Sequence, residues 1–193
     1  LADNSNPVPS MMCSSEQFTE HMQLAGVNQD SLVVIYEDQG LFSSARAWWM
    51  FKAMGFDNVK VLSGGLAKWQ ALGFATQASY SAATGQGNFV ASPRVDYFIS
   101  AEQVLNSLDE QSTLTLDARP YARFTGEQAE PREGMRSGHI PNSRCLSLST
   151  VLNDGELKPL SELQALFEQH IAPHHTQLQF SCGSGVTACA IAL

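Results

Sequence analysis

Short apolar runs separated by amphipathic stretches make up the first third of the chain. The runs at 32–36 and 59–62 predict strands, and the first of them is apolar on both faces, as buried strands of parallel sheets are. Helix signals lie around these runs. A serine followed by glutamate and glutamine predicts a capped helix over 15–26, and a glycine ends a second predicted helix over 43–54. A short third helix is expected at 66–72, after a Gly-Gly turn.

The same alternation returns in the second part of the chain. Another serine caps a helix, and the polar stretch at 117–139 predicts a long loop. The predicted elements are a helix over 100–108, strands over 113–116, 146–148 and 177–180, a helix over 161–170 and a helix that begins at 187. Strands that alternate with helices in this way predict an α/β fold in which parallel sheets are flanked by helices.

Two domains are expected on either side of a segment at 75–91, which is rich in alanine, serine, threonine and glycine and is typical of a linker. The domains, 1–74 and 92–193, carry a capped helix, a strand, a loop and a helix in the same order, which indicates an internal duplication. The second copy has a block at 99–158 that the first lacks, and the first continues through 50–74 where the second stops. We therefore expect the chain to be truncated at both ends, and the intact protein to have about 280 residues.

Composition and charge narrow the class of protein. Hydrophobic residues make up 44% of the 193 residues, which is enough for a packed core and excludes a disordered or collagen-like chain. The net charge of -8 disfavours nucleic acid and anionic membranes as partners. No apolar run approaches the ~18 residues that a membrane span needs. Residues 1–10 are polar and carry no secretory signal, so we expect a cytoplasmic protein.

Four cysteines provide the candidate chemistry, and one of them stands apart from the others. Cys13, Cys145, Cys182 and Cys189 form no C-x-x-C pair, so neither a zinc ribbon nor a thioredoxin-type motif is supported. A disulfide framework is not expected in a chain of this size with a large core, so we expect reduced thiols. Only Cys182 lies where a predicted strand meets a glycine-containing loop and a helix; the other three are expected to be structural.

The loop after Cys182 predicts a reactive thiolate. Unpaired backbone N–H groups and the positive end of the helix dipole stabilise an anion at a helix N-terminus, and the same field lowers the pKa of a thiol. Gly183 and Gly185 allow successive N–H groups to turn inward and form a cradle. A buried structural thiol is the alternative, and the strand–loop–helix setting makes it the weaker one.

The loop Cys182-Gly183-Ser184-Gly185-Val186-Thr187 resembles that of the tandem-domain sulfurtransferases of the rhodanese family, in the version that uses mercaptopyruvate. The thiosulfate version carries basic side chains at the second and third loop positions, where this chain has Gly183 and Ser184. Further motifs follow in family order: Asp117-Ala118-Arg119-Pro120, Arg123-Phe124, Glu130-Pro131-Arg132, Gly138-His139-Ile140-Pro141, and Gly40-Leu41-Phe42-Ser43 with Trp48-Trp49.

This resemblance implies two rhodanese-like domains, of which the N-terminal copy is inactive and the C-terminal copy carries the catalytic Cys182. It also implies that Arg123 and Arg132 bind a substrate carboxylate, for which paired guanidinium donors are well suited. Ser184 would manage the substrate's protons together with an aspartate of the first domain, for which this sequence offers no assignable residue. The other implied substrate-binding positions are those of the loop: Gly183, Gly185, Val186 and Thr187. The alternative for both arginines is a solvated or salt-bridged side chain, because Glu127, Glu130 and Glu133 are close in sequence.

The implied reaction moves sulfane sulfur from 3-mercaptopyruvate, through a persulfide on Cys182, to thioredoxin, another thiol or cyanide, and it releases pyruvate. The resemblance implies no metal and no organic cofactor. Thiosulfate as the donor, and a non-catalytic rhodanese-like interaction module, remain as alternatives. A cysteine phosphatase is a poor alternative, because its loop needs an arginine six positions after the cysteine and residue 188 is alanine.

Overall fold

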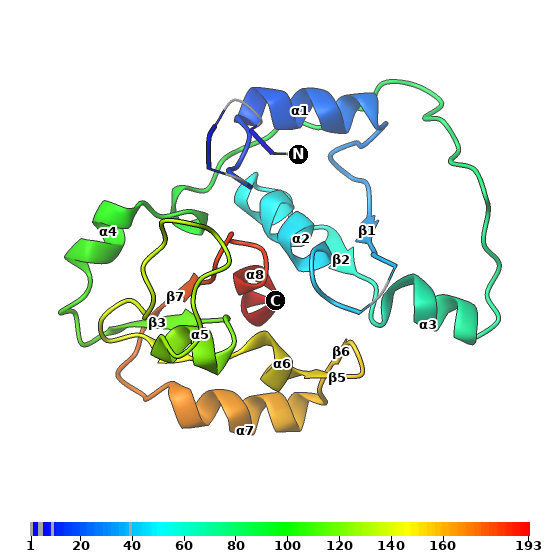
Figure 1. The fold of residues 1–193 in the computed structure, drawn as a ribbon. Helices are drawn as coiled ribbons and strands as arrows, with labels where there is room; N and C mark the ends of the chain where they lie inside the picture. Colours follow the sequence, from blue (N-terminus) through cyan, green and yellow to red (C-terminus); the bar gives the residue numbers. More distant parts are fainter. Residues whose placement is uncertain (1, 4–5, 9, 39) are drawn as a thin grey trace. The chain divides into compact units, whose positions relative to one another are not determined.

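The computed structural model describes residues 2–3, 6–8, 10–38 and 40–193, and the chain divides into two compact units, Leu1–Phe98 and Ile99–Leu193 (Figure 1). The segment predicted as a linker, 75–91, contains no helix or strand, but its end is part of the first unit. Phe89 is fully buried there, and its ring lies 5.7 Å from that of Phe18 and 5.5 Å from that of Phe56. The boundary between the units therefore falls later than residue 91.

The first unit contains a two-stranded parallel sheet and its helices. Its elements are α1 (Ser15–Leu24), β1 (Val33–Ile35), α2 (Ser44–Ala53), β2 (Val59–Val61), α3 (Gly65–Ala71) and the 3-10 helix η1 (Val95–Tyr97). Strands β1 and β2 pair in parallel, with Val33 opposite Val59. The predicted cap of the first helix is present: the N–H of Gln17 donates to the Ser14 hydroxyl, and the Gln17 side chain accepts from the N–H of Ser14.

The prediction that the first strand is buried on both faces is wrong. Val33 and Ile35 pack against the aromatic core that α1 and α2 build, but Val34 between them is 51% exposed. Leu32 and Tyr36, which flank the strand and point to the same side as Val34, are also exposed. The apolar run in the sequence identified the strand correctly. It could not indicate that, within the described part of the chain, only one face of this sheet is covered.

The second unit is built on a three-stranded parallel sheet with the order β4-β3-β7. Its elements are α4 (Ala101–Asn106), β3 (Thr113–Asp117), α5 (Tyr121–Thr125), β4 (Arg144–Cys145), α6 (Leu148–Val151), β5 (Leu152–Asn153), β6 (Glu156–Leu157), α7 (Leu160–His170), β7 (Gln177–Ser181) and α8 (Ala188–Ala192). The central strand β3 buries Leu114 and Leu116, and Val151 and Ile191 belong to the same core cluster. Parallel sheets with flanking helices confirm the predicted α/β fold. In the part of the chain that is described, no helix is both long enough and apolar enough to cross a membrane.

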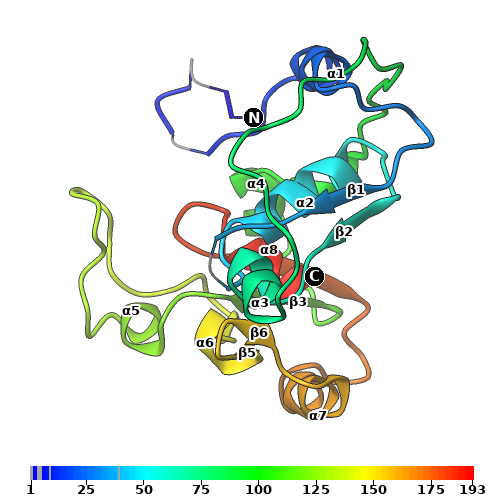
Figure 2. The ribbon, with the colours of Figure 1, turned by 90° about the vertical axis from the view of Figure 1, so that its right-hand side faces the viewer.

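Three local features of the second unit differ from the sequence prediction. The strand expected at 146–148 lies instead at β4, and Leu148 already begins α6, because the chain leaves the sheet at the buried Leu146. The polar loop contains the short helix α5. An antiparallel hairpin, β5–β6, turns at Asp154 and Gly155, both of which have positive φ, and it lies beside α6 in both views (Figures 1 and 2). Asp-Gly is a strong hairpin signal that the sequence analysis overlooked.

Candidate active site

Cys182 lies at the carboxyl end of the sheet in the second unit. Strand β7 ends at Ser181, which pairs with Asp117 at the end of the central strand β3. The half-buried Cys182 follows directly, and the loop runs to Thr187 before α8 begins. Because β3 and β7 are parallel, the long polar segment that follows β3 starts at the same edge of the sheet as the Cys182 loop. The fold thus brings together two segments that are far apart in the sequence.

The Cys182 loop is arranged to hold a negative charge on sulfur. Burial is the largest single influence on the pKa of Cys182 and raises it, but hydrogen bonds to the sulfur outweigh burial and leave the pKa below its ordinary value. These donors are the Thr187 hydroxyl and the backbone N–H groups of Ala188, Ser184 and Gly185. Gly185 has a φ of 69°, a conformation that few other residues adopt. The geometry therefore favours the thiolate that the sequence predicted.

Three loop residues, Ser184, Val186 and Thr187, shape the cradle and its opening. The Val186 carbonyl accepts from the N–H of Cys189 at 3.2 Å and so closes the loop onto α8. Ser184 is an exposed residue of the loop. Thr187 precedes the first residue of α8 without capping the helix through its side chain, because its hydroxyl is directed to Cys182.

Both arginines singled out in the sequence lie at this loop and meet at Gly183. Arg132 donates from Nη2 to the Gly183 carbonyl oxygen. The Nη2 atom of Arg123 lies only 3.0 Å from the position that a Cβ on Gly183 would occupy. Glycine at 183 therefore makes room for the Arg123 guanidinium, which a larger side chain would have to displace. This spatial role could not be read from the loop sequence alone.

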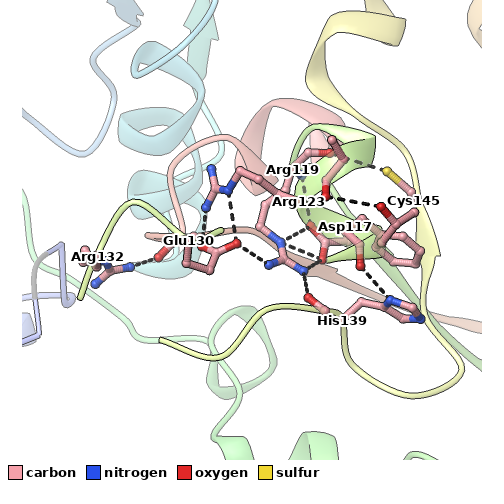
Figure 3. Close-up of polar contacts among 12 residues, drawn as sticks. Asp117, Arg119, Arg123, Glu130, Arg132, His139 and Cys145 are labelled. Carbon is pink, nitrogen blue, oxygen red and sulfur yellow. Dashed lines mark hydrogen bonds and ion pairs between the residues drawn. The ribbon is translucent and has the colours of Figure 1, made fainter. Parts of the chain in front are cut away.

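A partly buried ion-pair network, which the sequence indicated only as an alternative, holds one of these arginines (Figure 3). Glu130 accepts from Arg123 at 2.5 Å and 3.1 Å, and from Arg119 at 2.8 Å. Arg119 also pairs with Asp117, which is 2% exposed at the end of β3. Hydrogen bonding from Arg123 lowers the pKa of Glu130 against the effect of burial. The salt-bridged alternative for Arg123 is therefore correct, but the pair lies at the loop of the candidate nucleophile.

The remaining cysteines differ from Cys182 in their electrostatic surroundings. Burial raises the pKa of Cys13, and burial followed by the Asp117 carboxylate raises the pKa of Cys145. Cys145 donates weakly to the Arg119 carbonyl oxygen at 3.5 Å. Cys189 is 5% exposed, and its sulfur lies 3.3 Å from the carbonyl oxygen of Gly185.

The corresponding loop of the first unit carries a carboxylate in place of a thiol. Glu37 follows β1, and its carboxylate accepts from the backbone N–H groups of Phe42, Ser43 and Ser44, and from both serine hydroxyls. Burial opposes the charge, but these hydrogen bonds lower the pKa of Glu37 to about 2. The Glu37 carboxylate therefore occupies the position at the N-terminus of α2 where a helix binds an anion. The sequence indicated only that this copy is inactive, and it did not reveal the carboxylate; Gln39 of the same loop lies outside the described residues.

Replacement of Glu37 by glutamine is expected to destabilise the protein in a pH-dependent way. The folded pKa of about 2 lies below the ordinary 4.5, so the stabilisation is complete above about pH 4.5 and declines as the pH falls towards 2. After allowance for solvent screening, it contributes about 1 to 2 kcal/mol at neutral pH. Urea unfolding of Glu37→Gln at pH 7 and pH 3 measures this difference, with the exposed neighbour variant Asp38→Asn as the control. An equal loss of unfolding free energy at both pH values would contradict the assignment of this stabilisation to the charge of Glu37.

Comparison with known proteins places these observations in a family. Residues 4–72 and 100–193 match the family of rhodanese-like domains. The chain is 37% identical over 193 residues to the 3-mercaptopyruvate sulfurtransferase of Escherichia coli strain K12, covering 100% of this chain and 68% of that protein. It is 34% identical over 194 residues to the thiosulfate sulfurtransferase of Gallus gallus, covering 99% of this chain and 66% of that protein.

The fold agrees with these sequence matches. The crystal structure of SseA from Escherichia coli, described as a 3-mercaptopyruvate sulfotransferase, superimposes with a TM-score of 0.87 and 34% sequence identity. The match covers 100% of this chain and 71% of that one. The chain therefore belongs to the rhodanese-like domain family.

Proposed function

We propose that this chain provides the sulfur-transfer site of a 3-mercaptopyruvate sulfurtransferase. Cys182 receives sulfane sulfur from 3-mercaptopyruvate and passes it to an acceptor, and pyruvate is released. The observation that carries the proposal is the Cys182 loop, in which a hydroxyl and three backbone N–H groups lower the pKa of the thiol. The names of the Escherichia coli relatives support the choice of donor.

The first half of the reaction forms the persulfide. The Cys182 thiolate attacks the sulfur of 3-mercaptopyruvate, the carbon–sulfur bond breaks, and its electron pair leaves with the carbon as the enolate of pyruvate. The enolate then takes up a proton and becomes pyruvate. Ser184, exposed at the loop, is proposed to relay protons in this step. The N–H groups that lower the pKa of Cys182 also stabilise the charge on the persulfide.

Substrate binding is assigned to the two arginines and the loop. Arg123 and Arg132 lie at Gly183, where they offer guanidinium donors to the carboxylate of the donor molecule. Gly183, Gly185, Val186 and Thr187 form the wall of the loop against which the donor sulfur sits. The first domain is proposed to be non-catalytic, since Glu37 occupies its loop.

The second half of the reaction discharges the persulfide. A thiolate acceptor such as that of thioredoxin, or cyanide, attacks the outer sulfur, the sulfur–sulfur bond breaks, and the Cys182 thiolate is restored. The donor and the acceptor thus react in turn at one residue, which predicts ping-pong kinetics. A cytoplasmic location, where thiols stay reduced, suits this chemistry.

Thiosulfate is the second candidate donor, and the relative from Gallus gallus supports it by name. Thiosulfate is a dianion whose leaving sulfite benefits from basic side chains next to the cysteine, and this loop has Gly183 and Ser184 there. A non-catalytic interaction module is a weaker alternative, because Cys182 retains a thiol with a lowered pKa.

Kinetics with both donors test the choice of substrate. The wild-type protein is expected to have a kcat/KM for 3-mercaptopyruvate about 10 to 150 times that for thiosulfate, the equivalent of one charge-assisted contact of ~1.5–3 kcal/mol. Thiocyanate formation from cyanide measures both reactions in one assay. A higher kcat/KM with thiosulfate would reverse the assignment of the donor.

A further inference from the structure

The Glu130 carboxylate joins Arg123, which lies at the loop, to Arg119. Its side chain is 5% exposed, and Oε1 accepts from both Nη1 of Arg119 and Nε of Arg123. The other oxygen, Oε2, accepts from Nη2 of Arg123 at 2.5 Å. Arg123 is therefore held by a bidentate contact, which fixes both the position and the plane of its guanidinium. A single hydrogen bond would leave that plane free to rotate.

This contact is anchored to the central strand of the sheet. Arg119 donates to both oxygens of Asp117 through Nε and Nη2, and to the carbonyl oxygen of Gly138 at 2.8 Å. Asp117 is the last residue of β3. The charges thus alternate from Asp117 through Arg119 and Glu130 to Arg123, and each of these charges has a partner of opposite sign. The ion pairs thus attach the Arg123 side chain, which reaches the Cys182 loop, to the rigid sheet (Figure 3).

The same contact leaves one face of Arg123 available. Glu130 uses Nε and Nη2, and among the residues that the structure describes no hydrogen-bond acceptor is found for Nη1. Nη2 faces Gly183, at 3.0 Å from the place of an added Cβ. The guanidinium is therefore presented at the loop with an unused donor, which a carboxylate oxygen of a small ligand can take up.

We propose that Glu130 is a positioning residue that orients Arg123 towards the carboxylate of the sulfur donor. This inference rests on the proposed function, because it assigns Arg123 to the binding of that carboxylate. An arginine that is held in place before binding loses less side-chain freedom when the ligand arrives, and it meets the ligand in one geometry. Glu130 acts through Arg123 and does not touch the substrate.

A double-mutant cycle with 3-mercaptopyruvate tests this inference. Glu130→Gln keeps the shape of the side chain but removes its charge, and it is expected to lower kcat/KM by about 10- to 100-fold, mainly through KM. In the background of Arg123→Ala, the same change is expected to have little further effect, because the residue through which it acts is gone. The control is Glu133→Gln, in an exposed glutamate of the same segment, which should be neutral. Equal losses in both backgrounds would overturn the proposal.

Two further measurements separate positioning from folding. Glu130→Asp keeps the charge and should preserve the fold, but it is one methylene too short for the bidentate contact, so kcat/KM should still fall. Discharge of a preformed Cys182 persulfide to cyanide needs no carboxylate binding and should keep the wild-type rate in both variants. A slower discharge that matches the loss in kcat/KM would mean a structural role instead and would overturn the inference.

Binding of pyruvate distinguishes this inference from the proposed function. Calorimetric titration with pyruvate should show weaker binding for Glu130→Gln than for the wild type, and no such difference in the background of Arg123→Ala. This result does not depend on turnover. A wild-type protein that binds pyruvate in this way but does not transfer sulfur from 3-mercaptopyruvate would refute the proposed function and leave the role of Glu130 standing. Unchanged pyruvate binding in Glu130→Gln would refute the role of Glu130.

Discussion

Replacement of Cys182 by serine is expected to lower kcat/KM for sulfur transfer by about 10⁴-fold or more. A serine hydroxyl cannot form a persulfide, and the loop that lowers the pKa of the thiol cannot make an alkoxide at neutral pH. Release of pyruvate and formation of thiocyanate from cyanide both measure the loss. The melting temperature should change little, because serine is nearly isosteric and the donors of the loop remain.

The matched control is Cys145→Ser in the same unit. Burial and the Asp117 carboxylate raise the pKa of Cys145. Its sulfur contacts the Arg119 carbonyl oxygen and the backbone N–H of Ser147, and a serine hydroxyl can make both contacts. This variant should keep most of its activity. An active Cys182→Ser protein, or an inactive but folded Cys145→Ser protein, would mean that the nucleophile has been assigned to the wrong thiol.

Removal of both arginines from the loop is expected to have the second largest effect. Each guanidinium that meets the donor carboxylate contributes ~1.5–3 kcal/mol, so Arg123→Ala combined with Arg132→Gly should lower kcat/KM for 3-mercaptopyruvate by about 10² to 10⁴. The loss should be smaller for thiosulfate, which has no carboxylate. Steady-state kinetics with both donors, on the same protein samples, measure this difference.

Arg136→Ala is the control for a general change of charge. Arg136 lies in the same polar segment, is exposed, and carries the same charge as the two arginines at the loop. Its removal should leave both donors unaffected within about twofold, since screened surface charges contribute little. If kcat/KM of the double variant falls by the same factor with both donors, the arginines maintain the structure of the loop and do not bind the carboxylate.

Local sequence patterns were sufficient to select Cys182 as the candidate nucleophile. The strand, the cysteine, the two glycines and the small-residue helix are contiguous between 177 and 193, and each local signal agrees with the others. The capping serines of α1 and α4 were likewise predictable, because a capping box lies within four residues. The α/β fold followed from the alternation of strands and helices.

Features that depend on distant partners could not be predicted in this way. Glu130 is one of three glutamates in a polar segment, and only the folded loop decides which one pairs with Arg119 and Arg123. Glu37 is similar, because its role becomes visible only when the start of α2 turns back onto it. The exposed face of β1 could not be predicted for the same reason, because the sequence alone does not show which surfaces are covered by other elements.

Mapping of the persulfide by mass spectrometry tests the central claim most directly. The protein is treated with 3-mercaptopyruvate, the reaction is stopped with an alkylating agent, and the peptides that contain each of the four cysteines are compared. We expect the added sulfur on Cys182 alone, and its loss when cyanide is added. A stable persulfide on Cys13, Cys145 or Cys189, with Cys182 unmodified, would contradict the account.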